Sequence, residues 1–473
     1  MPSPLRELLE LMTQSVDALE RVCEEKGTPI PDLDAPFTPQ SEAFRKDPAA
    51  AEATKVIVAA AHHICAIVSR PTDQLYTFVA GPTRAAAVRT CLEANVSEIL
   101  REAGPSGMHV KDIAEKNGHD AEKLARFLRY LATGHIFREI APDVFAHNRV
   151  SSMLDTHKPS EEVIAKPESK YDNTRGVAAQ VSHHLDLTFK AASQAWETLA
   201  DPQTRLSNEP EDAPFARAFP ADKTLWNLLE RDAHARNRFD LTMIASAAAQ
   251  PPDAIFRAFA WETLPADALV VEVGGGMGTS AFPLAARFPR LRLVVQDLPG
   301  AVATAAPLWA ARLPAALASG RVLLQPHDCF APQPHAPAVF LLKMILHDWP
   351  DAHAARILAR LRAAARADTV LVLVDCLVPY ACRAAPAPAP DGAPAVPGAA
   401  DFQAPAPLLA NYGAANEFVY IMDMMMHMLF NAQERTVPQF TRLLQSEGWG
   451  VRAVHRTHEG NGIFLQSIEA VPI

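Results

Sequence analysis

The sequence predicts an α/β protein in which a Rossmann-like, doubly wound sheet follows an α-helical region that contains a winged helix. Short apolar runs alternate with helical patterns from 269 to 375, which is typical of a parallel sheet covered on both faces. Several glycines follow the first of these runs, where a turn of backbone can approach a ligand closely. Before this region, apolar residues recur mostly at intervals of three and four, as in amphipathic helices.

The composition is that of an ordinary globular protein, with 49% hydrophobic and 21% charged residues among 473. A formal net charge of -10 argues against a surface that wraps nucleic acid or adheres to an anionic membrane. The N-terminus lacks a basic start followed by an apolar core, and we find no uninterrupted apolar run of about 18 residues. We therefore expect a cytoplasmic protein that uses neither nucleic acid nor a membrane.

The six cysteines contain no C-x-x-C pair. Reduced thiols fit this scatter better than a disulfide or zinc framework, and we expect no metal site.

Helical periodicity covers residues 4–25, 49–68 and 84–102, with an irregular, proline-rich crossing at 27–48. Apolar helices that accumulate before any compact domain are more easily buried against a second subunit than against their own chain. We therefore expect a homodimer.

Residues 104–148 have the order of a winged helix: helices at Val110–Asn117 and Asp120–Thr133, then strand-like runs at His135–Ile140 and Val144–His147. In a DNA-binding protein the second helix would enter the major groove, but it carries no surplus of positive charge. A structural or dimer-supporting role is favoured.

The remaining elements are predicted in order along the chain. A polar surface excursion is expected at 155–180, helices at 184–199 and 224–249, and a flexible proline- and alanine-rich surface insertion at 380–412. The predicted strands are 269–273, 291–296, 321–325, 338–343, 369–375, 451–455 and 463–467, and the helices between them are 279–288, 300–312, 351–366, 415–430 and 436–446.

The glycine spacing favours an adenosyl ligand over a dinucleotide. Gly274, Gly276 and Gly278 are followed by Thr279, which stands where the last glycine of G-x-G-x-x-G would be. Asp297 ends the second strand, where doubly wound folds place a carboxylate on ribose hydroxyls, although such an Asp can also cap a helix.

The run FLLKMILHDWPD (340–351) begins as a buried strand and leaves it carrying Lys343 and His347. A histidine beyond a strand of this sheet lies beside the ligand, and an ordinary imidazole pKa near 6.5 suits it to accept a proton. Histidines in such loops are more often structural, so this residue alone does not define a site.

Six motifs in this order resemble the S-adenosylmethionine-dependent O-methyltransferases of the plant caffeate and flavonoid type and their fungal natural-product relatives. The resemblance covers about residues 85–467, apart from the insertion. The motifs are VEVGGGMG (271–278), QDLP (296–299), HDCF (327–330), LKMILHDWPD (342–351), VDCLVP (374–379) and NAQERT (431–436).

The resemblance implies that S-adenosylmethionine is the cofactor and that His347 is the general base, with Asp375 and Glu434 orienting its imidazole. Plant members usually have a Glu where this chain has Asp375, which is one methylene shorter. For the cofactor the resemblance implies contacts from Gly274, Gly276 and Gly278 to its methionine and ribose, from Asp297 to the ribose, from Asp328 and Cys329 to the adenine, and from Lys343 nearby.

The chemistry agrees with these implied roles. A sulfonium donor needs no metal because its leaving group is neutral, whereas the acceptor hydroxyl must lose its proton as the methyl arrives. A phenol with a pKa of ~10 is matched to a histidine base, and a plain alcohol is not. We therefore expect a phenolic acceptor.

The expected organisation has four parts. Residues 1–80 form a helical extension, 81–155 a winged-helix-like dimerisation domain, 156–255 a helical linker with substrate-pocket helices, and 256–473 the cofactor-binding domain. Alternatives are a winged-helix DNA-binding regulator with an adenosyl sensor, an NAD-dependent oxidoreductase, which the absence of G-x-G-x-x-G disfavours, and an N- or C-methyltransferase.

Overall fold

The computed structural model describes residues 3–250, 253–383, 396–456 and 465–473. The chain divides into two compact units. Unit 1 is Met1–Leu206 with Pro214–Ala249, and unit 2 is Ser207–Ala213 with Gln250–Ile473.

Unit 1 begins with two long helices, α1 (Pro4–Lys26) and α2 (Pro48–Val68), which confirms the helical prediction for 4–25 and 49–68. Between them lies a 3-10 helix, η1 (Pro39–Lys46). The helix predicted over 84–102 is wrong in detail, because Asn95 adopts a left-handed φ of 55° and divides it. The structure has α3 (Pro71–Val79), which was not predicted, then α4 (Gly81–Glu93) and α5 (Val96–Ala103).

One helix of the described residues, α2, is long and apolar enough to cross a membrane by length and composition alone. Its apolar run is interrupted in the sequence by Glu52 and Lys55, which form an ion pair at 2.9 Å. Only 28% of its most apolar 18-residue window is buried. Much of its apolar surface is therefore uncovered in unit 1.

Two helices and a small sheet follow at 104–148 in the predicted order. α6 ends at Gly118, which has a left-handed φ of 72°, and the side chain of Asp120 accepts a hydrogen bond that caps α7. A two-residue strand before α6 was not predicted. The elements are β1 (Met108–His109), α6 (Val110–Asn117), α7 (Ala121–Thr133), β2 (Arg138–Ala141) and β3 (Val144–Ala146), with strand order β1-β3-β2.

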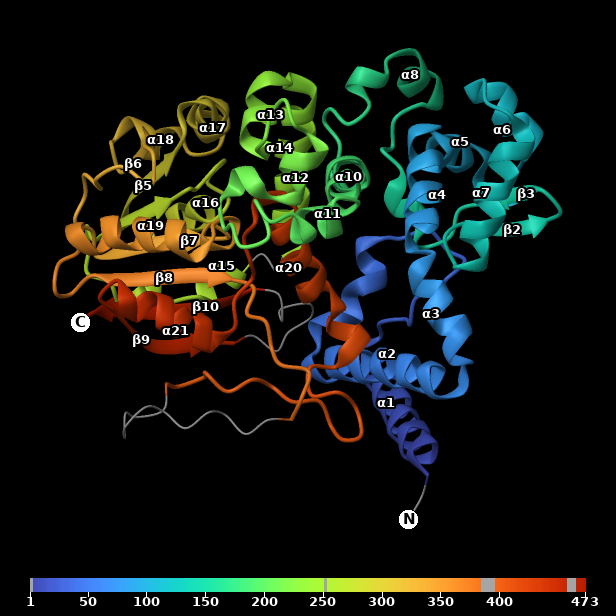
Figure 1. The fold of residues 1–473 in the computed structure, drawn as a ribbon, viewed down its shortest axis with the longest axis horizontal. Helices are drawn as coiled ribbons and strands as arrows, with labels where there is room; N and C mark the ends of the chain where they lie inside the picture. The colour runs from blue at the N-terminus through green and yellow to red at the C-terminus, as the bar shows by residue number, and fades with distance from the viewer. Residues whose placement is uncertain (1–2, 251–252, 384–395, 457–464) are drawn as a thin grey trace. The chain divides into compact units, whose positions relative to one another are not determined.

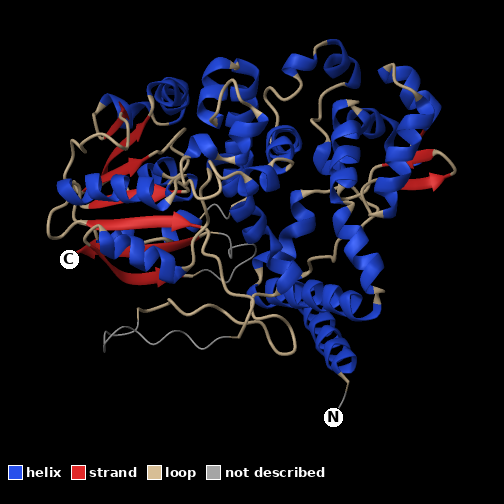
Figure 2. Ribbon diagram, in the orientation of Figure 1, coloured by secondary structure: helices blue, strands red, loops and turns tan. Residues whose placement is uncertain are grey.

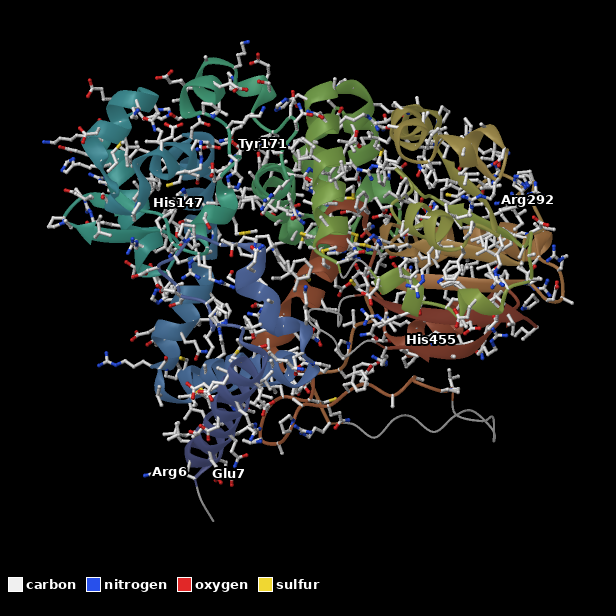
Figure 3. The ribbon with its side chains drawn as sticks, turned by 180° about the vertical axis from the view of Figure 1, so that it is seen from behind. Arg6, Glu7, His147, Tyr171, Arg292 and His455 are labelled. Atoms are coloured by element: carbon white, nitrogen blue, oxygen red, sulfur yellow. The ribbon has the colours of Figure 1, made fainter. Side chains whose placement is uncertain are left out.

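The polar excursion predicted at 155–180 is wrong, because Lys170 and Tyr171 are buried there and the Lys170 ammonium donates to the backbone carbonyl of Leu92. Figure 3 labels Tyr171 together with His147, whose ring also lies buried in unit 1 and contacts the carbonyl of Ser97 at 2.7 Å. This stretch holds η3 (Ser151–Leu154), α8 (Ser160–Ala165), η4 (Pro167–Ser169) and the start of α9 (Val177–His183).

The two long helices predicted next are both interrupted. The first becomes the π-helix η5 (His184–Thr188), α10 (Phe189–Ala192) and α11 (Ala195–Ala200). The second divides at Asp232, whose side chain caps the helix that follows it. The remaining helices of unit 1 are α12 (Pro214–Ala218), α13 (Leu225–Arg231) and α14 (Ala233–Ala248).

Unit 2 contains a seven-stranded sheet with the order β6-β5-β4-β7-β8-β10-β9 (Figures 1 and 2). The first five are parallel, and β10 runs antiparallel to both β8 and β9. The five parallel strands lie within one residue of their predicted ranges. The strands are β4 (Leu269–Val273), β5 (Arg292–Asp297), β6 (Val322–Pro326), β7 (Val339–Lys343), β8 (Val370–Asp375), β9 (Trp449–His455) and β10 (Gln466–Pro472).

Alternate residues of β4, β5, β7 and β8 enter separate cores on the two faces of the sheet. Val270 packs with Trp309 in one core, and Val271 packs with Leu358 in the other. This confirms the predicted doubly wound fold. The helices of unit 2 are α15 (Ala254–Arg257), α16 (Ala281–Arg287), α17 (Pro299–Arg312), α18 (Pro314–Ala318), α19 (Asp351–Ala364), α20 (Glu417–Phe430) and α21 (Val437–Ser446), with short 3-10 helices η6 (Pro210–Asp212), η7 (Trp261–Thr263), η8 (Leu346–Asp348) and η10 (Gly413–Asn416).

The flanks of the predicted insertion are packed. The Arg383 guanidinium donates to the carbonyls of Ala404 (2.6 Å) and Leu408 (2.9 Å), and both of these residues are buried. The expectation of a flexible loop across 380–412 is therefore wrong for these flanks, and its centre, 384–395, lies outside the described residues.

Candidate active site

The predicted site residues of the parallel strands gather at one edge of the sheet in unit 2. Strand register aligns Val273 with Gln296 and Lys343 with Val374, so the chain leaves β4, β5, β7 and β8 at the same level. The glycine turn, Asp297, His347 and Asp375 therefore follow neighbouring strands, as a doubly wound sheet requires of a ligand site.

The glycine turn packs against Trp309 at Gly278 and has free space at Gly276. Gly274, Gly276 and Gly278 have left-handed φ values of 69°, 54° and 76°. A Cβ on Gly278 would lie 2.6 Å from the ring of Trp309, whose indole N–H donates to the carbonyl of Met277 at 3.1 Å. A Cβ on Gly276 would meet nothing within 4 Å, so a ligand has room to approach the backbone there.

Asp297 holds this turn instead of capping the next helix. Its Oδ2 accepts a hydrogen bond from the backbone N–H of Gly276 at 2.7 Å, and its Oδ1 accepts one from Leu298 at 2.7 Å. Burial raises the pKa of Asp297, and these two hydrogen bonds oppose the rise. Each carboxylate oxygen keeps a second lone pair, which suits it to accept hydrogen bonds from the two hydroxyls of a ribose.

Glu272 lies beneath the turn and was not predicted as a site residue. Its carboxylate is buried and accepts a hydrogen bond from the backbone N–H of Ala281 at 3.2 Å. Burial raises the pKa of Glu272 to about 7, although the charge of Lys343 opposes this, and burial lowers the pKa of Lys343. The signal in the sequence was the single acid within the apolar run 269–273.

Asp328 and Cys329 lie in the loop after β6. The backbone N–H of His327 donates to the Asp297 carbonyl at 2.8 Å, which joins this loop to the end of β5. Asp328 is exposed and accepts a hydrogen bond from the N–H of Phe330 at 2.9 Å. Burial raises the pKa of the half-buried Cys329 to about 12, so its thiol stays protonated.

His347 lies in η8, just after β7, and its ring is buried between acids. Nδ1 lies 2.7 Å from Oε1 of Glu434, and Nε2 lies 3.5 Å from Oδ1 of Asp348. Burial alone would lower the pKa of His347, but the charges of Glu434, Asp348 and Asp375 and the hydrogen bond to Glu434 raise it to about 10. The sequence-based expectation of an ordinary imidazole pKa is therefore wrong.

The two carboxylates that were predicted to orient His347 differ in their contacts. Glu434 is hydrogen-bonded to the ring, whereas both oxygens of Asp375 are buried and have no hydrogen-bond partner. Burial raises the pKa of Asp375 to about 7, which the charge of His347 opposes and that of Glu434 reinforces. Asp375 therefore affects His347 through its charge, which raises the pKa of the imidazole, and not through a hydrogen bond.

Two further residues of the site were missed. Asp348, next to His347 in the sequence, is the acid beside Nε2. Arg435 is buried and donates to the carbonyls of Leu346 at 2.7 Å and Trp349 at 2.8 Å, so it holds both sides of the turn that carries His347. Its place in the NAQERT motif beside Glu434 was the only signal for this role.

Comparison with known proteins identifies the family. Residues 196–388 match a family model described as an O-methyltransferase domain. The chain is 69% identical to 4-O-methyltransferase 1 of Phanerochaete chrysosporium over all of both proteins, and 42% identical to an O-methyltransferase of Armillaria gallica over 96% of each. The chain therefore belongs to the O-methyltransferase family.

Solved structures share the fold. The mitomycin 7-O-methyltransferase MmcR matches with a TM-score of 0.62 and 23% identity, covering 85% of this chain and 98% of its own. OxaC in complex with sinefungin and meleagrin matches with a TM-score of 0.64 and 19% identity, covering 98% and 99%. LepI in complex with SAM matches with a TM-score of 0.67 and 17% identity, covering 98% and 100%.

Proposed function

We propose that this O-methyltransferase transfers a methyl group from S-adenosylmethionine to a phenolic hydroxyl of an aromatic small molecule, with His347 as the general base. The observation that carries the proposal is the 2.7 Å pair of His347 and Glu434 at the sheet edge that also bears the glycine turn.

The residues of the turn fit the proposed cofactor. Gly276 leaves open space above the backbone, and Asp297 is oriented by the same turn with lone pairs free for ribose hydroxyls. When bound, S-adenosylmethionine supplies a methyl group on a positively charged sulfur, which leaves as a neutral thioether. Gly274, Gly276, Gly278 and Asp297 would hold it, with Asp328, Cys329 and Lys343 nearby.

The acidity of the acceptor hydroxyl indicates the chemical class of the acceptor. A phenol has a pKa of ~10, like the tyrosine side chain, and the pKa of His347 is also about 10. A proton shared between the two groups would therefore move at little cost, and the phenolate that His347 leaves would be the nucleophile for the methyl group that the bound cofactor supplies. Glu434 stabilises the imidazolium that holds the proton. A plain alcohol is too weak an acid for this transfer.

We further propose that the reaction needs no metal, although the ligand atoms of His347, Asp375 and Glu434 lie within 4.8 Å of one another and could surround an ion. Metal ligands must be deprotonated, and the charge of Glu434 raises the pKa of His347, so a metal ion would have to compete with the proton on its imidazole. Turnover should survive dialysis against a chelator. A loss of turnover that Zn²⁺ or Mg²⁺ restores would contradict this.

Calorimetry and mass spectrometry test the proposed function together. We expect S-adenosylmethionine and S-adenosylhomocysteine to bind, and NAD and duplex DNA not to bind. In a screen of phenols, amines and carbon acids of matched size, phenols should gain the mass of one methylene. Methyl transfer only to amines or carbon would favour an N- or C-methyltransferase, and DNA binding would favour the regulator.

We also propose that the enzyme is a homodimer that buries the apolar surface of α2 and α3. Much of the apolar surface of α2 is uncovered and α3 has no buried residue, and a second copy is a partner that is always available. Leu75→Glu with Phe78→Glu should convert dimers into monomers in sedimentation experiments, whereas Leu206→Glu, at an exposed leucine outside α2 and α3, should not. The exposed residues are Ile67, Val68, Leu75, Tyr76, Phe78 and Val79.

A further inference from the structure

Three side chains of unit 2 form a compact buried group with ligand atoms for a metal ion. His347, Asp375 and Glu434 each offer one such atom, and these atoms lie within 4.8 Å of one another. The three residues are only 5%, 1% and 3% exposed. Among the described histidine, cysteine and acidic residues, no second set of three comes together in this way. We call these three residues the acid–histidine group.

Three carboxylate oxygens of the acid–histidine group have no hydrogen-bond partner in the described part of the chain. They are Oδ1 and Oδ2 of Asp375 and Oε2 of Glu434. The fourth oxygen, Oε1 of Glu434, lies 2.7 Å from Nδ1 of His347. A buried carboxylate without a partner costs folding free energy, so two of them in one place need an explanation beyond stability.

Negative charge is in excess around the imidazole. Asp348 is a third acid at the ring, with Oδ1 3.5 Å from Nε2 of His347. Three carboxyl groups therefore face one imidazole, and a proton on the ring can balance only one of them. Arg435 is a cation whose charge also acts on Asp375, but its guanidinium donates its hydrogen bonds to Asp351 and to two backbone carbonyls. A divalent cation would balance the remaining negative charge.

The backbone holds the two carboxylates of the group close together. Asp375 ends the buried strand β8, and two residues later Leu377 forms a parallel bridge with Arg435, which follows Glu434. The backbone N–H of Val378 donates to the carbonyl of Arg435 at 3.1 Å. The ligand atoms are therefore positioned by fixed elements, which favours metal binding.

The chemistry and the spacing of the ligand atoms fit Zn²⁺. This ion binds imidazole nitrogen and carboxylate oxygen at about 2.0–2.2 Å, so two ligand atoms on one tetrahedral Zn²⁺ lie about 3.3 Å apart. The limit of 4.8 Å therefore leaves at most ~1.5 Å to close, which changes in side-chain torsion angles can supply. Mg²⁺ fits less well, because it prefers octahedral oxygen ligands and keeps several of its waters.

We propose that the acid–histidine group binds one Zn²⁺ through Nδ1 of His347 and carboxylate oxygens of Asp375 and Glu434, and that this ion inhibits methyl transfer. The proton that Nδ1 shares with Glu434 is released to the solvent when the ion binds. The remaining ring hydrogen then lies on Nε2, beside the carboxylate of Asp348. Metal-bound histidines usually donate their second N–H to a carboxylate or a carbonyl.

Inhibition follows from the protonation of the zinc-bound ring. One nitrogen of His347 binds the ion and the other bears a hydrogen, so neither has a lone pair that can accept the proton of a phenol. The enzyme is therefore active without Zn²⁺ and inactive with it. This inhibition rests on the proposed role of His347 as the general base, whereas the binding of the ion does not.

Calorimetric titration of the full chain with Zn²⁺ tests the site without turnover. We expect one tight site per chain, a proton release seen as a heat that differs between two buffers, and no comparable binding of Mg²⁺. Asp375→Asn and Glu434→Gln should each weaken Zn²⁺ binding by about 10-fold or more. His455→Gln is the control, because it removes a similar pair, His455 and Glu469 at 2.9 Å, that belongs to no such group of three among the described residues.

Kinetics then test the inhibition. With a phenol that the enzyme methylates, the rate should fall as free Zn²⁺ rises through the calorimetric Kd, and excess chelator should restore it. The His455→Gln variant should be inhibited at the same concentration of Zn²⁺ as the wild type.

The outcomes separate the two proposals. Equal Zn²⁺ affinities of the wild type, Asp375→Asn and Glu434→Gln would overturn this inference and show an adventitious ion only, for example at the exposed thiols of Cys65 and Cys382. Equal affinities for Zn²⁺ and Mg²⁺ would overturn it as well. Zn²⁺ binding that both variants weaken, without any effect on methyl transfer, would support the metal site but reject both the inhibition and His347 as the base.

Discussion

His347 and Glu434 lie 87 positions apart in the sequence, and the fold of unit 2 brings Nδ1 of one to 2.7 Å from Oε1 of the other. Glu434 is itself fixed, because its backbone N–H donates to Oδ1 of Asp423 in α20 at 2.9 Å. The imidazole therefore meets a carboxylate whose position is set before any substrate binds. This relationship determines both the orientation and the high pKa of His347.

Glu434→Gln keeps a hydrogen-bond acceptor for Nδ1 but removes the charge that raises the pKa of His347 most. In the wild type, kcat/KM should rise with pH from 7 toward 10, because His347 must lose its own proton before it can accept the proton of the phenol. The variant should be slower by about 10²- to 10⁴-fold, because the imidazolium is no longer stabilised. The rise of kcat/KM with pH should also occur at lower pH in the variant, because the pKa of His347 is lower without the charge of Glu434.

Glu434→Asp is the control. It retains the charge, so kcat/KM should rise at nearly the same pH as in the wild type. An identical pH profile in Glu434→Gln and the wild type would show that Glu434 does not set the pKa of His347.

Asp375→Asn tests the buried acid that has no hydrogen-bond partner. The pKa of Asp375 is about 7 in the folded chain and ~3.9 when unfolded, so between these values the native state binds a proton that the unfolded state lacks. The wild type should therefore lose stability as pH rises from 4 to 7. Asparagine cannot ionise, so the Tm of the variant relative to the wild type should rise between pH 5 and pH 8.

The pKa shift of Asp375 implies that the wild type loses roughly 2 to 4 kcal/mol of its free energy of unfolding by the time the pH exceeds 7. The asparagine variant is neutral and loses none of it. A difference in Tm that does not change with pH would show that Asp375 is not held protonated by burial.

Gly278→Ala tests the glycine turn. The φ of 76° is strained for alanine, and its Cβ would lie 2.6 Å from Trp309, whose ring is fully buried and cannot move away. Calorimetry should show at least a tenfold loss of affinity for S-adenosylhomocysteine. Gly81→Ala, at a glycine with open space and no left-handed φ, should bind as the wild type does. Equal affinities for the two variants would remove the turn from the cofactor site.

Arg435→Lys tests the support of the turn that carries His347. Lysine cannot reproduce the planar contacts of the guanidinium with the carbonyls of Leu346 and Trp349, so the turn that carries His347 should loosen. We expect kcat to fall by roughly 10- to 100-fold with little change in the KM of S-adenosylmethionine. Arg442→Lys, on the exposed side of α21, is the control. A fall in stability without any fall in kcat would assign Arg435 a purely structural role.

The sequence predicted the central sheet well because its strands are buried on both faces. Runs such as 269–273, which is apolar apart from Glu272, and 370–374 are then largely apolar and have clear ends. Helices were predicted less well where one residue interrupts them. Asn95 adopts a left-handed conformation and Asp232 caps a new helix, and both lie inside a continuous helical pattern.

Only part of the candidate site could be predicted from the sequence. The glycine turn and Asp297 follow strands, so the topology alone places them together. Glu434 follows a helix, and only the resemblance linked it to His347. Asp348 and Arg435 were missed because their roles depend on the direction in which a side chain leaves a tight turn, which apolar periodicity does not encode.

The most direct test of the account is the rate of a single methyl transfer by His347→Ala, with phenol acceptor and S-adenosylmethionine saturating and cofactor affinity measured by calorimetry on the same sample. We predict that the rate falls by about 10²- to 10⁴-fold while the cofactor Kd stays within about twofold of the wild type. An unimpaired rate would contradict the account, because it would show that the acceptor loses its proton without a base from the protein.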